Sequence, residues 1–173
     1  YVRLSRAGFR RSHGLAYRPA CPSCSSCVPV RINVVRFKDT KSFRRIRRAN
    51  VDLITENISA FATAEQYRLF SRYQHRRHNG GDMSSMSYEE YRVLIEDTPV
   101  QTRLIEFRNG ENKLVAVMLA DQMIDSLSAV YSFFDPDPSD RSHGTYMILW
   151  LVEHARELGL EYVYLGYLIE DTP

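Results

Sequence analysis

Hydrophobic and polar positions divide the chain into a first half of mixed, largely helical pattern and a second half that alternates with a period of two. In the first half, the segment Asp39-Thr-Lys-Ser can cap a helix, and Thr63 and Ser87 are suitable N-caps for two more. Aromatic residues recur at helical spacing after Thr63. The elements predicted in this half are strands over 15–17 and 28–37 and helices over 43–50, 64–79 and 87–97.

The second half has the pattern of an antiparallel sheet followed by one helix and a last strand. Apolar and polar residues alternate, and the Asn-Gly pair at 109–110 predicts a hairpin turn. The helix pattern returns after a Pro-rich loop, with Ile148 and Leu151 on the buried face and Gly159 as the expected C-terminal cap. The elements predicted here are strands over 103–108, 114–120, 126–134 and 161–168 and a helix over 144–158. This order predicts an α+β fold with a single crossover at its end.

The size and composition describe one globular unit. The 173 residues are enough to bury one main core, and 44% hydrophobic with 25% charged residues is typical of a globular protein. No apolar run approaches the roughly 20 residues that span a bilayer, and no signal peptide is visible, so we expect a cytoplasmic protein. The chain opens with Tyr-Val-Arg-Leu and ends on Asp-Thr-Pro, and it reads as a fragment.

Charge is strongly divided along the chain although the net charge is only +2. Residues 1–50 contain 13 Lys or Arg and a single acid, Asp39, whereas residues 51–173 contain 10 Lys or Arg and 20 Asp or Glu. A basic block joined to an acidic body is typical of a protein that binds a nucleic-acid backbone. The alternative is a basic patch that docks on the acidic half of the same protein.

Three cysteines within seven residues, Cys21, Cys24 and Cys27, form the first candidate site. In a reducing compartment, two-residue gaps favour a zinc ion or an iron–sulfur cluster over a disulfide. Three ligands are one short of a closed structural site, so the fourth is expected from His13, a Cys before residue 1 or a bound ligand. The alternative is three small buried thiols in a tight loop.

Arginines that lack compensating acids form the second candidate site, a nucleic-acid interface. In the predicted helix, Arg44, Arg47 and Arg48 share one face at helical spacing, which suits a phosphate backbone. The complete set comprises Arg10, Arg11, Arg18, Arg31, Arg44, Arg45, Arg47 and Arg48. The alternative is an ordinary solvated surface.

The junction over 139–145 is the third candidate site, because it follows a strand and opens a helix. Unpaired backbone N–H groups at such a junction bind phosphate groups. GNAT acyltransferases have an Arg/Gln-x-x-Gly-x-Gly/Ala turn here, and Arg141-x-x-Gly144 fits its first half. Tyr146 replaces the second Gly, which counts against coenzyme A. His75, His78 and His154 are expected on the surface or in packing, and no pattern indicates a covalent nucleophile.

Several segments together resemble the arginyl/leucyl-tRNA–protein transferases. In the N-terminal part these are Gly8-Phe-Arg-Arg-Ser, Cys21-Pro-Ser-Cys-Ser-Ser-Cys-Val-Pro-Val-Arg-Ile and Lys41-Ser-x-x-Arg. In the C-terminal part these are Tyr67-x-Leu-Phe-x-x-Tyr, Val130-Tyr-Ser-Phe-Phe-Asp-Pro, Ser142-x-Gly-Thr and Tyr164-Leu-Gly-Tyr. The match spans essentially the whole chain and is most similar to the short bacterial branch, the aspartate/glutamate leucyltransferases. Family members usually begin with an earlier Cys-containing segment and continue past Thr172.

The resemblance implies transfer of leucine from leucyl-tRNA to a protein whose N-terminus is Asp or Glu, as in the N-degron pathway. It implies a basic Cys-containing N-terminal region over 1–50 and a GNAT-like acyltransferase domain over 51–173. No cofactor is implied for transfer itself, although the cysteines of eukaryotic relatives bind an iron–sulfur cluster. The tRNA contacts are expected from Arg10, Arg11, Arg44, Arg45, Arg48, Arg141, Gly144 and Thr145.

Aminolysis of an aminoacyl ester needs positioning and an oxyanion donor more than a strong base. A terminal α-amine has a pKa of about 7.7–8.0 and is partly a free nucleophile near pH 7. Tyr131 and Tyr167 are the expected donors and should border the same cleft, and Asp135 is expected to receive the amine proton. The alternatives are arginine transfer with an acidic pocket for the guanidinium, an acetyl-CoA-dependent N-acetyltransferase, and a non-catalytic RNA-binding module with a zinc knuckle.

Overall fold

Eight strands and six helical segments make up the computed structural model, which describes residues 1–137 and 140–170. The helical segments are α1 (Val2–Arg6), α2 (Lys41–Ala49), α3 (Ala64–Arg77), the 3₁₀ turn η1 (Asp82–Ser85), α4 (Tyr88–Glu96) and α5 (His143–Glu157). The strands are β1 (Arg10–Ser12), β2 (Leu15–Tyr17), β3 (Val28–Asn33), β4 (Ile54–Ser59), β5 (Thr102–Arg108), β6 (Leu114–Gln122), β7 (Ser126–Phe134) and β8 (Tyr162–Leu168).

Six of the strands form one mixed sheet in the order β3-β8-β7-β6-β5-β4, and β1 and β2 form a separate hairpin. All neighbours in the sheet are antiparallel except β7 and β8, which α5 connects in parallel. The predicted α+β class is therefore confirmed. Strand β3 comes from the basic N-terminal region and pairs with β8, so the two ends of the chain share one sheet. The division into regions 1–50 and 51–173 stays a prediction.

Local signals explain where the helices begin. The Thr63 hydroxyl accepts a hydrogen bond from the Gln66 backbone N–H, and the Gln66 side-chain oxygen accepts one from the Thr63 backbone N–H. Ser87 forms the same capping box with Glu90. Helix α2 begins at Lys41 because Thr40 is its N-cap. The predicted caps of α3 and α4 are thus confirmed, and α2 starts earlier than predicted.

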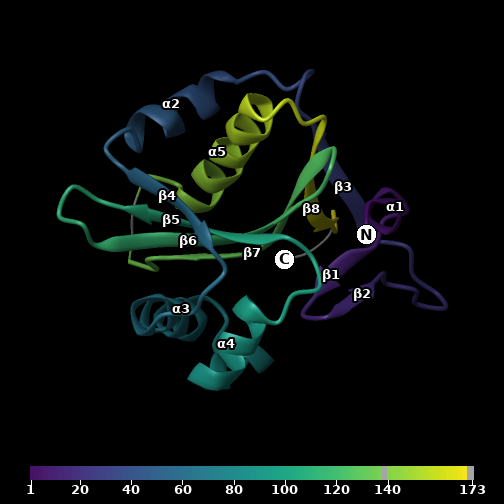
Figure 1. Cartoon of the computed structure of the whole chain (residues 1–173), viewed down its shortest axis with the longest axis horizontal. Helices are drawn as coiled ribbons and strands as arrows, with labels where there is room; N and C mark the ends of the chain where they lie inside the picture. Colours follow the sequence, from purple (N-terminus) through teal and green to yellow (C-terminus); the bar gives the residue numbers. More distant parts are fainter. Residues whose placement is uncertain (138–139, 171–173) are drawn as a thin grey trace.

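The helices lie on both faces of the sheet, with α2 and α5 on one side and α3 and α4 on the other (Figure 1). Side chains alternate between the two faces along each strand, so the neighbours Leu104 and Ile105 belong to different hydrophobic clusters. Strand β6 is buried along nearly its whole length because it is covered on both faces. Leu151 lies on the buried stripe of α5, as predicted.

The pairing between β7 and β8 is short, and this shapes the centre of the molecule. The two strands pair only from Ser126 with Tyr162 to Ser128 with Tyr164. Beyond this point β7 continues along β6, with a bulge at Val130 because Ala129 and Tyr131 oppose consecutive residues of β6. A gap therefore opens in the sheet between β7 and β8.

Four elements were not predicted from the sequence: α1, β1, β4 and the 3₁₀ turn η1. Strand β4 is an edge strand with a mostly polar, exposed sequence, and β1 consists of Arg10, Arg11 and Ser12. Neither has the apolar alternation on which a strand prediction depends. At the predicted Asn-Gly turn, Asn112 rather than Gly110 takes the left-handed conformation, with a φ of 60°. In the described part of the chain, no helix is both long and apolar enough to cross a membrane.

Candidate functional site

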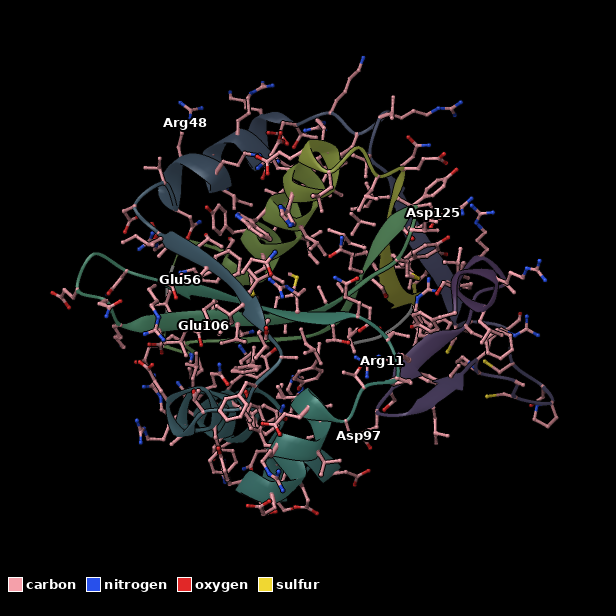
Figure 2. The ribbon with its side chains drawn as sticks, viewed as in Figure 1. Arg11, Arg48, Glu56, Asp97, Glu106 and Asp125 are labelled. Carbon is pink, nitrogen blue, oxygen red and sulfur yellow. The ribbon has the colours of Figure 1, made fainter. Side chains whose placement is uncertain are left out.

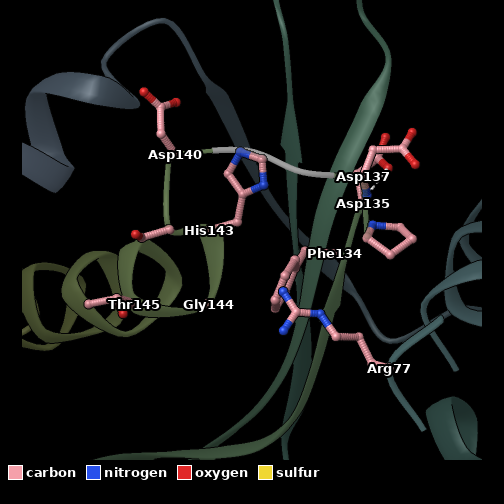
Figure 3. Close-up of a pocket in the computed structure, with 10 residues that line it drawn as sticks. Arg77, Phe134, Asp135, Asp137, Asp140, His143, Gly144 and Thr145 are labelled. Atoms are coloured by element: carbon pink, nitrogen blue, oxygen red, sulfur yellow. Dashed lines mark hydrogen bonds between the residues drawn. The ribbon is translucent and has the colours of Figure 1, made fainter.

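A cavity of about 660 Å³ lies where β7 ends and α5 begins. Its walls come from Phe134 and Asp135 at the end of β7, from Arg77 at the end of α3, and from Gly144 and Thr145 in the first turn of α5 (Figure 3). The predicted loop-to-helix junction therefore does form a cavity. Of its predicted residues, Gly144 and Thr145 line the cavity and Arg141 does not.

Helix α5 begins without a side-chain cap. Its N-cap, Ser142, has left-handed backbone angles (φ 53°, ψ 51°), and its hydroxyl makes no capping hydrogen bond. A non-glycine residue in this region is uncommon and carries a conformational cost. The first backbone N–H groups of a helix have no partner within it and attract anions. This end of α5 therefore retains the donors that the sequence analysis expects for a phosphate group.

Phe134 forms the aromatic floor of this cavity. A Cβ at Gly144 would lie 3.3 Å from its Cε1 atom, so the absence of a side chain at Gly144 lets α5 approach the ring closely. The Arg77 guanidinium lies 5.4 Å from the ring centroid and the Tyr73 ring 5.0 Å from it. Arg77 was not predicted, because it sits at the end of an ordinary surface helix with no motif to single it out.

His143, the first residue of α5, is a second cavity residue that the sequence analysis missed. Its side chain is drawn between Asp140 and Asp137 in Figure 3, and the residue is only 8% exposed. Its buried Nε2 atom has no hydrogen-bond partner among the described residues. Burial first, and then the positive charge of Arg141, lower the pKa of His143 below its ordinary value. The ring is therefore held largely neutral at pH 7.

Asp135 lines the cavity, but its carboxylate is already paired with two basic side chains. Arg72 donates to Oδ1, and the Lys113 ammonium lies 2.9 Å from Oδ2. Burial alone would raise the pKa of Asp135, but the hydrogen bond from Lys113 and the charge of Arg72 outweigh it and hold this pKa below its ordinary value. A carboxylate held in this way is a weak base, which does not favour the role of proton acceptor.

The two predicted tyrosines lie in different surroundings. The Tyr131 hydroxyl accepts a hydrogen bond from Gln74, and Tyr131 lines the gap between β7 and β8. The Tyr167 hydroxyl donates to the carbonyl oxygens of Gly8 (2.8 Å) and Tyr17 (3.2 Å), next to the β1–β2 hairpin. The expectation of two hydroxyls bordering one cleft is not met in this arrangement, because the N-terminal hairpin holds Tyr167.

The arginines of α2 divide into an outer set and one inward residue. Arg44, Arg45 and Arg48 are exposed, and none of them forms an ion pair with a carboxylate in the described part of the chain; Arg48 points outward in Figure 2. Arg47 instead lies 2.7 Å from Asp39 and 3.1 Å from the carbonyl oxygen of Leu149. Arg44, Arg47 and Arg48 were predicted to share one exposed face of the helix. This prediction is wrong for Arg47, which packs towards α5.

Three other predicted tRNA contacts have partners inside the protein. Arg11 is buried against Asp121, near the β1–β2 hairpin (Figure 2). Arg10 is also buried and donates to carbonyl oxygens, among them that of Val30 at 3.0 Å. Arg141 pairs with Asp52. The structure corrects the assignments of Arg10 and Arg11, because a buried guanidinium is not presented to a phosphate, whereas the tRNA contact of Arg141 stays a prediction.

The three thiols of the cysteine loop do not converge on one point. Cys21 and Cys24 are exposed and Cys27 is half-buried. The Cys24 thiol lies 3.4 Å from the Ser26 hydroxyl, and hydrogen bonding to Ser26 lowers the pKa of this thiol. Across residues 1–137 and 140–170, no group of three or more His, Cys, Asp or Glu is placed to hold a metal ion. The loop in this arrangement does not fit a metal or cluster, which stays a prediction from the spacing alone.

Two solved structures share this fold. L-PGS from Bacillus licheniformis superimposes with a TM-score of 0.60 at 11% identity, over 82% of this chain and 46% of that one. The C-terminal domain of a putative lysylphosphatidylglycerol synthetase from Agrobacterium fabrum gives a TM-score of 0.59 at 14% identity, over 97% of this chain and 51% of that one. At these identities the likeness shows the fold alone.

Sequence comparisons define the family. Residues 1–45 match the description "Arginine-tRNA-protein transferase, N terminus" and residues 65–173 match "Arginine-tRNA-protein transferase, C terminus", so the chain belongs to the arginine-tRNA-protein transferase family. The family predicted from the motifs is thereby confirmed, and with it the class of enzyme, an aminoacyltransferase.

Curated relatives are named aspartate/glutamate leucyltransferases. The protein of Paramagnetospirillum magneticum is 56% identical over 98% of this chain and 69% of its own length. The protein of Gluconacetobacter diazotrophicus is 54% identical over 98% of this chain and 65% of its own length. The chain thus spans about two thirds of the length of these relatives.

Proposed function

We propose that the protein transfers leucine from leucyl-tRNA to the N-terminus of proteins that begin with Asp or Glu, the reaction of the N-degron pathway expected from its motifs. The names of relatives about half identical to this chain support the leucyl group and the acidic acceptors. The partners are then a charged tRNA and a protein N-terminus, and the cytoplasm is the expected location of both.

The observation that carries this proposal is the cavity at the start of α5 beside the gap in the sheet. The cavity lies at the uncapped end of α5, and Phe134 provides a ring on which an adenine can stack. Gly144 lets the first turn of α5 lie close to this ring, and Arg77 provides a cation at the rim. The terminal adenosine of the tRNA with its phosphate fits these features, and Gly144 and Thr145 keep their predicted role.

The outer arginines of α2 are proposed to contact the tRNA backbone. Arg44, Arg45 and Arg48 project to solvent from one helix and lack carboxylate partners in the described structure. Phosphate contacts of this kind contribute affinity that falls as salt concentration rises. Arg10 and Arg11 are not part of this surface, since they hold the N-terminal hairpin in place.

Tyr131 is the proposed oxyanion donor. Its oxygen accepts from Gln74, so its own proton remains available to the carbonyl oxygen of the ester. Burial raises the pKa of Tyr131 above its ordinary value, and the phenol therefore stays protonated at neutral pH. Tyr167 and Asp135 are proposed to position neighbouring elements, because carbonyl oxygens hold the first and cations the second.

The core is proposed to be GNAT-like. The mixed sheet, the bulge at Val130 and the parallel strand pair that separates after three residues support this assignment.

Arginine transfer is the second candidate. Asp137 and Asp140 line the cavity at the start of α5, and carboxylates bind a guanidinium well. The two reactions are separated by an assay with the full-length protein, labelled leucyl-tRNA or arginyl-tRNA, and peptides that begin with Asp, Glu or Ala. Leucine on the Asp and Glu peptides supports the proposal, and arginine on the same peptides replaces it with the second candidate.

A further inference from the structure

A second cavity, of about 330 Å³, occupies the gap between β7 and β8. It lies beyond the last strand pair, Ser128 with Tyr164, and the bulge at Val130 turns β7 away from β8 at this point. Helix α5 covers one side of the gap with Ile148. The cavity is thus built into the topology of the sheet.

The walls of this cavity are aliphatic. Ala129, Val130, Ile148 and Leu165 provide the apolar surface, and Gly166 provides bare backbone. The polar side chains are hydroxyls alone, since none of the described residues that line the cavity carries a charge. This composition differs from that of the cavity at the start of α5, which contains Arg77 and three aspartates.

The two cavities follow one another along the same strand and the same helix. Along β7, residues 129–132 line the gap, and Phe134 and Asp135 line the cavity at the start of α5. Along α5, Ile148 belongs to the gap and Thr145 to the other cavity, less than one turn apart. An ester whose adenosine occupies the polar cavity therefore extends its amino acid towards the gap.

We propose that the gap between β7 and β8 holds the side chain of the transferred amino acid and selects an aliphatic side chain over a charged one. This inference rests on the proposed function and adds the subsite that sets its specificity. A guanidinium placed there would lose its hydration without gaining a charged partner. An aliphatic side chain gains by leaving water, and each missing or added methylene changes discrimination roughly 10- to 200-fold.

Gly166 gives the cleanest test, because its Cβ position is open. A Cβ built there meets no described atom within 4 Å, and the glycine does not use the left-handed region. A Gly166→Val change therefore adds bulk to the gap without straining the backbone. Gly110, on the β5–β6 turn, has an equally open Cβ position away from both cavities, so Gly110→Val is the matched control.

The experiment compares transfer of leucine and of alanine from the same tRNA, charged with either amino acid, by the full-length protein. Gly166→Val is expected to lower kcat/KM for leucine at least tenfold and to lower that for alanine much less. Gly110→Val should leave both values unchanged. A second variant, Ile148→Ala, enlarges the gap and is expected to raise phenylalanine transfer relative to leucine transfer.

Each outcome tests either the proposed subsite or the proposed function. Equal loss for leucine and alanine, or no loss for either, in folded Gly166→Val protein overturns the subsite. If Gly166→Val does not fold, an unchanged phenylalanine-to-leucine ratio in Ile148→Ala overturns it. An unmodified protein that transfers no leucine at all contradicts the proposed function instead, so the two failures are distinguishable.

Discussion

The guanidinium of Arg11 and the carboxylate of Asp121 form a two-pronged ion pair in the interior, with both N–O distances at 2.8 Å. Their side chains are 1% and 0% exposed, and the Thr102 hydroxyl donates a third hydrogen bond to Asp121 at 2.7 Å. This pair ties the β1–β2 hairpin to the central strand β6. The most basic part of the chain is thus fixed to the sheet by one of its own arginines.

Removing one partner of this pair should be costly. Arg11→Met leaves the Asp121 carboxylate buried without its cation, and we expect a loss of about 3–5 kcal/mol in the free energy of unfolding. Urea unfolding followed by circular dichroism measures it, with the exposed Arg36→Met as control. The double variant Arg11→Met/Asp121→Leu should recover much of the loss, because it leaves no unpaired charge. A single variant as stable as the control would contradict this account of the hairpin.

The outer face of α2 should control the salt dependence of tRNA binding. Replacing Arg44 and Arg48 with Ala should weaken binding and reduce the slope of log K against log salt by about 1 for each lost phosphate contact. Filter binding at several salt concentrations gives this slope. Arg92→Ala on α4, whose guanidinium is already paired with Glu89, is the control. An unchanged slope would show that the α2 arginines are ordinary surface residues that do not contact the tRNA backbone.

Arg77 and Arg76 are adjacent and exposed, but only Arg77 lines the cavity at the start of α5. Arg77→Met should raise KM for leucyl-tRNA about tenfold, since a hydrogen bond to a charged group contributes about 1.5–3 kcal/mol. Arg76→Met should have no such effect. KM for the acceptor peptide should be unchanged in both. A rise confined to the acceptor would mean that the cavity holds the protein N-terminus instead of the tRNA.

His143 should make stability dependent on pH. Its pKa is lowered in the folded state, so below an unfolded-state pKa of about 6.5 the folded chain binds fewer protons than the unfolded one. The stability that neutral His143 contributes is therefore complete above about pH 7 and is lost as the pH falls from about 7 to 5. The free energy of unfolding should fall less over this range in His143→Gln than in the unmodified protein or in the exposed-residue control His75→Gln. Identical pH dependence in all three proteins would show that His143 does not resist protonation.

The features predicted correctly from the sequence are those set by neighbouring residues. The N-caps Thr63 and Ser87 and the buried stripe of α5 each depend on residues within a few positions, so they can be predicted from the sequence directly. The Asn-Gly turn is similar, although the left-handed residue is Asn112.

The features that were missed depend on distant partners. The partner of Arg11 lies 110 positions away, and the basic block therefore looked like a surface patch although two of its arginines are interior. Arg47 turns inward because Leu149 offers a carbonyl oxygen, which helical spacing does not reveal. Residue spacing predicted convergence at the cysteines, and it fixes neither the loop path nor the directions of the thiols.

The most direct test of the proposed function is a competition between two charged tRNAs in one reaction. The full-length protein receives equal leucyl-tRNA and arginyl-tRNA together with peptides that begin with Asp, Glu or Ala, and mass spectrometry identifies the residue added to each. The structure and its relatives predict leucine on the Asp and Glu peptides, with the Ala peptide unchanged. Arginine on the acidic peptides, or leucine on all three, would contradict the account.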